Sequence, residues 1–236
     1  MLPTSTQHAI HPALNSIHLR IAQACQSSGR NTDEVTLLAV SKTKPLSDVL
    51  EAYAYGQRHF GENYLQDALE KIEQCPVEDI QWHFIGTIQS NKTKAIASSF
   101  NWVHTLDRIK IARRLNDQRP SHLPPLKVLI QVNISNETNK SGVVLGQLNE
   151  LAEQISKLPK LTLCGLMCIP AAQQSEVSQR RAFTQMAEAR DQLQSTYPAL
   201  KELSMGMSSD LASAIACGST IVRIGTDIFG ARTALT

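Results

Sequence analysis

Long apolar runs and a strong excess of charge are both missing from this sequence of 236 residues. No stretch is long enough to cross a bilayer, and the first residues lack the basic-then-apolar layout of a signal peptide. The 23 basic and 21 acidic side chains leave a net charge of +2, which argues against nucleic acid or an anionic membrane surface as the main partner. These absences predict a cytoplasmic protein.

Cysteines are few, and their spacing does not suggest a metal site. The five cysteines are an odd number, and most lie inside apolar runs, as buried thiols of a reducing compartment do. Cys164 and Cys168 have no companion ligands at the spacing that zinc requires. We therefore expect buried thiols and no metal.

The chain also lacks linkers and low-complexity segments, and it repeats one unit of a strand followed by a helix. About eight strands recur in this way, at residues 35–41, 58–61, 81–86, 102–104, 126–134, 161–169, 203–207 and 221–225. This repeat predicts an α/β fold, a single (β/α)₈ TIM-type barrel over residues 35–232 within one domain, 1–236. An open doubly wound sheet is the competing fold, but it would carry a glycine fingerprint for phosphate where this chain carries lysines.

Several helix boundaries can be predicted from capping residues. An extra N-terminal helix, 11–29, has one apolar face and is expected to cover one end of the core. Asn63 is expected to cap the helix after the second strand, with Gln66 completing a capping box. Asp107 is expected to cap the helix after the fourth strand.

Two lysines follow the first strand. The run 36–45 stops being apolar at Lys42 and Lys44, and Pro45 then opens a helical pattern. Chemistry in α/β folds gathers where strands end, and an amine that loses its water beside another cation favours the neutral, nucleophilic form. Either lysine could therefore attack an aldehyde, although lysines at strand ends mostly just reach solvent.

The last two strand-to-helix turns could bind a phosphate. Ser208 and Ser209 precede one helix, and Gly225 and Thr226 follow the eighth strand, where barrels often hold phosphate groups. Simple helix capping explains the same residues equally well. Asp210 fits capping better, because it would repel a phosphate unless it turned away.

Arg223 lies within the eighth strand, which should be buried. An unpaired guanidinium is costly there, so Arg223 needs an acceptor nearby. A salt bridge to an acidic residue is one possibility, and a ring nitrogen of a bound cofactor is the other. His83 could stack on a ligand, but a hydrogen-bonded core histidine is the simpler expectation.

Taken together, these segments resemble the pyridoxal phosphate homeostasis protein family, over nearly the whole chain and in one order. The matching motifs are Leu38–Pro45, Phe60–Tyr64, Trp82–Gly86, Gln89–Lys92, His104–Asp107, Leu129–Ser135, Lys140–Gly142, Gly165–Met167, Leu203–Ser208, Val222–Thr226 and Ile228–Arg232. The resemblance implies a barrel similar to the N-terminal domain of alanine racemase and a bound pyridoxal 5′-phosphate (PLP).

The resemblance also implies a role for particular residues. By position, Lys42 resembles the lysine that forms an aldimine with PLP, and Lys44 resembles a second lysine that helps to hand the cofactor over. The other implied contacts are Ser208, Gly225 and Thr226 for the phosphate, Arg223 for the pyridine nitrogen, and Asn63 and Met167 as lining residues.

Three functions compete at this stage. The first is a monomeric PLP carrier for vitamin B6 homeostasis that supplies PLP-requiring apo-enzymes without efficient catalysis. Two features favour it: arginine leaves the ring nitrogen neutral, and the chain ends soon after the eighth strand, without the second domain a racemase uses. The second is a racemase-like PLP enzyme. The third is an aldolase that uses Lys42 directly on a sugar phosphate. A protein-interaction scaffold is a weaker fourth, because no exposed apolar stripe stands out in the sequence.

Overall fold

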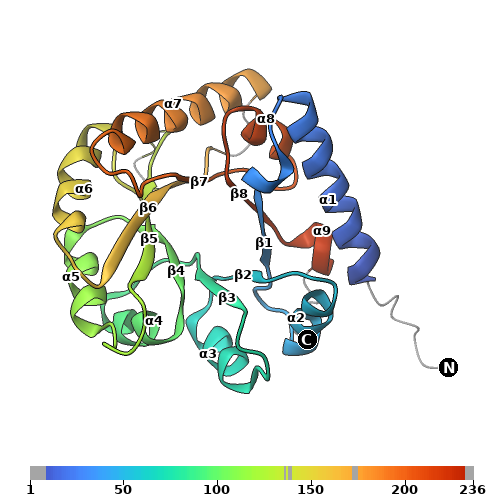
Figure 1. The fold of residues 1–236 in the computed structure, drawn as a ribbon, viewed down its shortest axis with the longest axis horizontal. Helices are drawn as coiled ribbons and strands as arrows, with labels where there is room; N and C mark the ends of the chain where they lie inside the picture. The colour runs from blue at the N-terminus through green and yellow to red at the C-terminus, as the bar shows by residue number, and fades with distance from the viewer. Residues whose placement is uncertain (1–8, 136, 138–139, 172–174, 232–236) are drawn as a thin grey trace.

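The computed structural model describes residues 9–135, 137, 140–171 and 175–231. Eight parallel strands pair in chain order, and β1 also pairs with β8, so that the sheet closes into a barrel (Figure 1). The strands are β1 (Thr36–Val40), β2 (His59–Glu62), β3 (Gln81–Phe84), β4 (Trp102–Leu106), β5 (Leu126–Val132), β6 (Leu161–Cys168), β7 (Glu202–Ser204) and β8 (Ile221–Ile224). The predicted eight-stranded α/β barrel is confirmed.

Helices follow the strands and form an outer ring (Figure 1). They are α1 (Ile10–Ser27), α2 (Leu46–Ala54), α3 (Leu65–Gln74), α4 (Thr93–Ser99), α5 (Ile109–Gln118), α6 (Leu148–Ser156), α7 (Glu176–Gln194), α8 (Leu211–Ala216) and α9 (Thr226–Phe229). None of the helices in these described residues is long and apolar enough to span a membrane.

Alternation along the strands divides the buried side chains into two cores. Val35, Leu37 and Ala39 face outward, into the large apolar layer between the sheet and the helices. Leu38 and Leu129 face inward, where they pack in a smaller cluster inside the barrel. The barrel interior also holds buried polar side chains, so it is apolar only in part.

The N-terminal helix lies on the side of the barrel, which corrects the expectation that it covers one end. Its buried face carries Leu14, Ile17 and Ile21, as the 3.6-residue period predicts, and Gly29 ends the turn after it with φ of 65°. The helix packs against α2, α8 and α9 (Figure 1). Because the helix after β8 has only four residues, α1 covers the outer surface that this short helix leaves open.

Local boundaries were less predictable than element order. The expected caps are wrong: α3 and α5 begin after Tyr64 and Arg108, and neither helix has a side-chain cap. The expected helix after β5 starts with a 3₁₀ turn, Leu145–Gln147. Residue 232, where the expected barrel ends, lies outside the described residues. All five cysteines are free, and three of them are buried.

Candidate functional site

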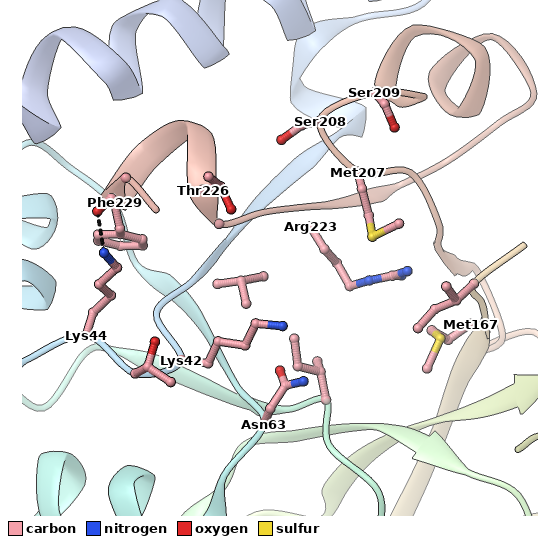
Figure 2. A pocket seen from close by; sticks show the side chains of 16 residues that line it. Lys42, Lys44, Asn63, Met167, Met207, Ser208, Ser209, Arg223, Thr226 and Phe229 are labelled. Atoms are coloured by element: carbon pink, nitrogen blue, oxygen red, sulfur yellow. Dashed lines mark hydrogen bonds between the residues drawn. The ribbon is translucent and has the colours of Figure 1, made fainter. Parts of the chain in front are cut away.

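A cavity of about 320 Å³ opens at the mouth where the carboxyl ends of the strands meet. All eight residues to which the family resemblance gives a role line it, although they come from five different strands or the turns that follow them. The lining comprises Val40, Lys42, Thr43, Lys44, Asn63, Ile85, Met167, Ile169, Met207, Ser208, Ser209, Arg223, Gly225, Thr226, Phe229 and Gly230. Figure 2 shows the side chains of Lys42 and Arg223 both reaching into this cavity, from the ends of the neighbouring strands β1 and β8.

A tight turn separates the two lysines. β1 ends at Val40, and the Lys44 amide donates to the Ser41 carbonyl over 3.1 Å, while Thr43 adopts a left-handed φ of 63°. Strand alternation therefore does not continue through this segment, and the two lysines point in different directions although they are two positions apart. Lys42 points across the cavity, whereas Lys44 points toward the end of α9 (Figure 2).

Lys44 is held by backbone carbonyls. Its ammonium donates to the Phe229 carbonyl over 2.6 Å and to the Ala231 carbonyl over 3.0 Å. These are carbonyl groups at the carboxyl end of a helix, where a cation is favoured. Lys44 thus ties the turn after β1 to the turn after α9, and of the two lysines Lys42 is better placed to meet a ligand.

We expect the left-handed turn to store strain, because Thr43 is β-branched. A left-handed conformation costs an L-residue about 1–2 kcal/mol. Replacing Thr43 by Gly should raise the free energy of unfolding by about 1 kcal/mol, measured by urea denaturation. Thr43→Ala is the matched control, because it keeps a β-carbon and should gain much less. Equal stability of the two variants would contradict the strain.

A buried ion pair supports the same turn from behind. The Lys71 ammonium lies 2.6 Å from a Glu62 carboxylate oxygen and donates to the Ser41 carbonyl over 2.8 Å. The Ser41 hydroxyl donates to that same carboxylate oxygen over 2.6 Å. Burial raises the pKa of Glu62, and the ammonium of Lys71 opposes this effect. Ser41 precedes Lys42, so the pair fixes the backbone that presents the cavity lysine.

The two neighbouring loops after β7 and β8 form another part of the cavity wall. Ser208 and Ser209 lie in the turn before α8, and Gly225 precedes α9, whose first residue is Thr226. The Asp210 carboxylate accepts a 2.6 Å hydrogen bond from the Met207 amide. Asp210 therefore folds back on its own loop, so the repulsion expected of it toward an anion is reduced.

The guanidinium of Arg20 joins these loops on the outer side. It donates to the Ser208 carbonyl and lies 2.8 Å from the Asp227 carboxylate of α9. Arg20 belongs to α1, so the N-terminal helix links the two loops as well as covering the side of the barrel. We call the contacts of Arg20 with Ser208 and Asp227 the Arg20 clamp. The sequence analysis missed this residue, because a half-exposed arginine on a surface helix carries no local signal.

Arg223 lies inside the barrel and is 6% exposed. It donates to the carbonyl and hydroxyl of Ser204, each over 2.7 Å, and to the Cys168 carbonyl over 2.9 Å. Among the described residues, no acidic side chain forms an ion pair with it. Burial lowers the pKa of Arg223, and nearby Cys168 and Asp210 oppose that shift. Its Nε–H and one Nη2–H have no acceptor in the described part of the chain, so they can serve a ligand.

Asn63 also has a polar atom that could bind a ligand. Its amide oxygen is buried and has no partner among the described residues. Asn63 does not cap α3, which starts two residues later, and the predicted cap is wrong. Its side chain lines the cavity instead. A buried acceptor of this kind is costly unless a ligand donates to it.

Other predicted groups lie away from the cavity or behind it. His83 is buried, stacks on Trp102 at 5.2 Å between ring centroids and bonds to two other histidines, so it is a core residue as expected. Apolar lining residues such as Ile169, Met207 and Phe229 were not predicted, because nothing distinguishes them from core residues in the sequence.

Comparison with known proteins gives one consistent result. The family model "Alanine racemase, N-terminal domain" matches residues 14–233. A pyridoxal phosphate homeostasis protein of Escherichia coli (strain K12) is 53% identical over 222 residues, which cover 93% of this chain and 95% of that protein. The chain belongs to this family. Its counterpart in Vibrio cholerae is 54% identical and covers 95% of this chain and 97% of that protein.

A solved structure supports the same assignment. PipY of Synechococcus elongatus PCC7942, with PLP bound, is 35% identical and superposes with a TM-score of 0.82 over 94% of this chain and 100% of that chain. The family resemblance and the alanine racemase-type barrel predicted from the sequence motifs are therefore confirmed. The roles assigned to individual cavity residues remain predictions.

Proposed function

We propose that this chain holds PLP in the cavity through a Schiff base on Lys42. The amine adds to the aldehyde carbon and water leaves. The observation that carries the proposal is that Lys42 and Arg223 line one cavity whose wall also includes two loops fit for an anion. The name of the E. coli relative and the PLP-bound structure of PipY support it.

The residues of this chain fit the cofactor at each end. The hydroxyls of Ser208 and Thr226 and the amides around Gly225 would hold the phosphate. A β-carbon at Gly225 would lie 3.1 Å from the Val40 carbonyl oxygen, so the lack of a side chain there keeps the loop close to β1. Arg223 would donate a free N–H to the ring nitrogen, and Asn63 and Met167 would line the ring.

Arg223 also argues for holding the cofactor without efficient turnover. PLP catalysis uses the ring as an electron sink, which is strongest when its nitrogen is protonated. A guanidinium can only donate to that nitrogen, so the nitrogen stays neutral and the sink is weak. We propose a cytoplasmic, monomeric carrier, with Lys44 assisting release to PLP-requiring apo-enzymes. The match to the racemase family model keeps a racemase-like PLP enzyme as the alternative.

One measurement tests the Schiff base directly. Purified protein is incubated with PLP, reduced with borohydride and digested, and the peptide carrying the pyridoxyl group is located by mass spectrometry. We expect the label on Lys42. Label on Lys44 or on surface lysines alone would contradict the proposal. Turnover of alanine and other amino acids by the loaded protein, at rates typical of enzymes, would favour the racemase-like alternative.

We expect the Arg20 clamp to contribute modestly to PLP binding. Arg20 and Asp227 are 39% and 35% exposed, so their pairing is worth no more than about 1 kcal/mol. Arg20→Met should weaken PLP binding by up to about fivefold, measured by titration, because the two loops proposed to hold the phosphate lose their link. Lys157→Met is the control, since Lys157 pairs with Glu153 on its own helix and lies in no contact with these loops. Equal losses in both variants would contradict the clamp.

A further inference from the structure

A row of three histidines crosses the barrel interior. His59 Nδ1 lies 2.9 Å from His83 Nε2, and His83 Nδ1 lies 2.8 Å from His104 Nε2. His104 Nδ1 lies 2.9 Å from the Ser204 hydroxyl oxygen, which accepts a 2.7 Å hydrogen bond from Arg223. The row joins Arg223, at the ligand cavity, to His59, which begins β2 at the opposite mouth and is partly exposed.

The donors and acceptors in this row can be assigned from its ends. Arg223 can only donate, so the Ser204 oxygen accepts from it, and the hydroxyl proton is free to go to His104 Nδ1. His104 then carries its proton on Nε2 and donates to His83, which in the same way donates to His59. The reverse assignment would leave the Ser204 proton without an acceptor among the described residues. In every hydrogen bond of the row, the donor is therefore the partner nearer to Arg223. We call such a row polarised away from Arg223.

The surroundings keep the three rings neutral, as this assignment requires. Burial lowers the pKa of His83 and His104 well below the usual value and lowers that of His59. Arg223 adds to this at His104, and Lys127 adds to it at His59 and His83. No carboxylate bonds to any of the three rings in the described parts of the chain. With all three rings neutral, the direction of the row is set by the hydrogen bond that Arg223 donates to Ser204.

We propose that His104, acting through Ser204, is a positioning residue for Arg223, and that His83 couples the ligand cavity to the opposite mouth of the barrel. The row fixes the Nη1 edge of the guanidinium through Ser204. The Nε–H and the second Nη2–H then remain available to a ligand in the cavity. When a ligand accepts a hydrogen bond from Arg223, the hydrogen bond from Arg223 Nη1–H to Ser204 changes in strength. Neighbouring hydrogen bonds polarise one another, so the change is passed from Ser204 to His104, His83 and His59 in turn. The identity of the ligand rests on the function proposed above.

Nuclear magnetic resonance of the protein without PLP tests the row itself. Imidazole nitrogen shifts should show all three rings in the Nε2–H form and neutral at pH 7. Any ring in the Nδ1–H form, or charged, would overturn the proposal. Adding PLP should then shift the nitrogen signals of His59, although His59 does not line the cavity. No shift at His59 when PLP is bound would overturn the coupling.

Two variants separate coupling from positioning. His83→Phe keeps a ring that can stack on Trp102 but removes both nitrogens, so the response of His59 should disappear while PLP still binds. His104→Phe removes the acceptor of the Ser204 hydroxyl and should raise the dissociation constant of PLP by about tenfold and shift its absorption maximum. Leu129→Ala is the control for packing, because it opens the barrel core but removes no hydrogen bond of the row, and it should leave the absorption maximum unchanged.

The outcomes distinguish this proposal from the proposed function. If PLP fails to bind the wild-type protein but the three tautomers are as assigned, the PLP function fails and the polarised row stands. If PLP binds and His104→Phe behaves like wild type in affinity and absorption, the row is not a positioning device. If Leu129→Ala shifts the absorption maximum as much as His104→Phe does, packing alone explains the effect and the proposal is overturned.

Discussion

Replacing Lys42 by Ala should abolish the covalent attachment of PLP and the visible absorption band that accompanies it. The phosphate loops and Arg223 would still contact the cofactor, so some non-covalent binding should remain. Losing the bond should raise the dissociation constant by about 100-fold or more. The measurements are absorbance of the loaded protein and retention of PLP through gel filtration. The wild-type protein should keep its cofactor, and the variant should lose it.

Lys44→Ala is the matched control for that experiment. The two lysines are separated by one residue, but the turn at Thr43 sends the Lys44 ammonium to the carbonyls of Phe229 and Ala231. Lys44→Ala should keep the absorption band and weaken binding by less than tenfold. A band that survives in Lys42→Ala and disappears in Lys44→Ala would contradict our assignment of the bound amine.

The composition of the cavity could be predicted because of how parallel barrels are built. Carboxyl ends of all strands meet at one mouth, so polar residues at strand ends converge even when they lie far apart in the sequence. Lys42 and Arg223 are separated by most of the chain, yet both line the same cavity. Their convergence followed from the repeat of strand and helix, and required no knowledge of register.

Features that depend on register or on packing between distant elements could not be predicted. The bond between His104 and Ser204 joins residues 100 positions apart, and it depends on how far each strand is shifted along the barrel. β-Bulges in the pairing of β5 with its neighbours alter that shift. Helix α1 lies on the side of the barrel because α9 is short. The period of apolar residues within α1 does not reveal the length of α9.

Lys71→Met should have the largest effect on stability. Lys71 and Glu62 are 6% and 0% exposed, and their charged atoms are 2.6 Å apart. Removing one partner of a buried pair leaves an uncompensated charge, which typically costs about 3–5 kcal/mol. The second carboxylate oxygen of Glu62 has no partner among the described residues, so little else stabilises that charge. Urea denaturation at pH 7 should show this loss.

The loss should depend on pH in a defined direction. Burial already raises the pKa of Glu62 in the folded state above its unfolded value, and removing the Lys71 ammonium should raise it further. Folding then favours the protonated carboxyl, a contribution that is complete below the unfolded pKa of about 4.3 and disappears as pH rises through the folded pKa. The variant should therefore lie close to wild type near pH 4 and lose most stability above neutrality.

A double variant identifies the source of the loss. Glu62→Gln with Lys71→Met keeps an acceptor for the Ser41 hydroxyl but carries no buried charge. It should recover most of the stability at pH 7 and lose the pH dependence. If Lys71→Met were equally destabilised at pH 4 and pH 8, or the double variant recovered nothing, the lost packing of the lysine stem would be the cause. Because Lys71 also binds the Ser41 carbonyl, the double variant should hold PLP less tightly than wild type even when it folds well.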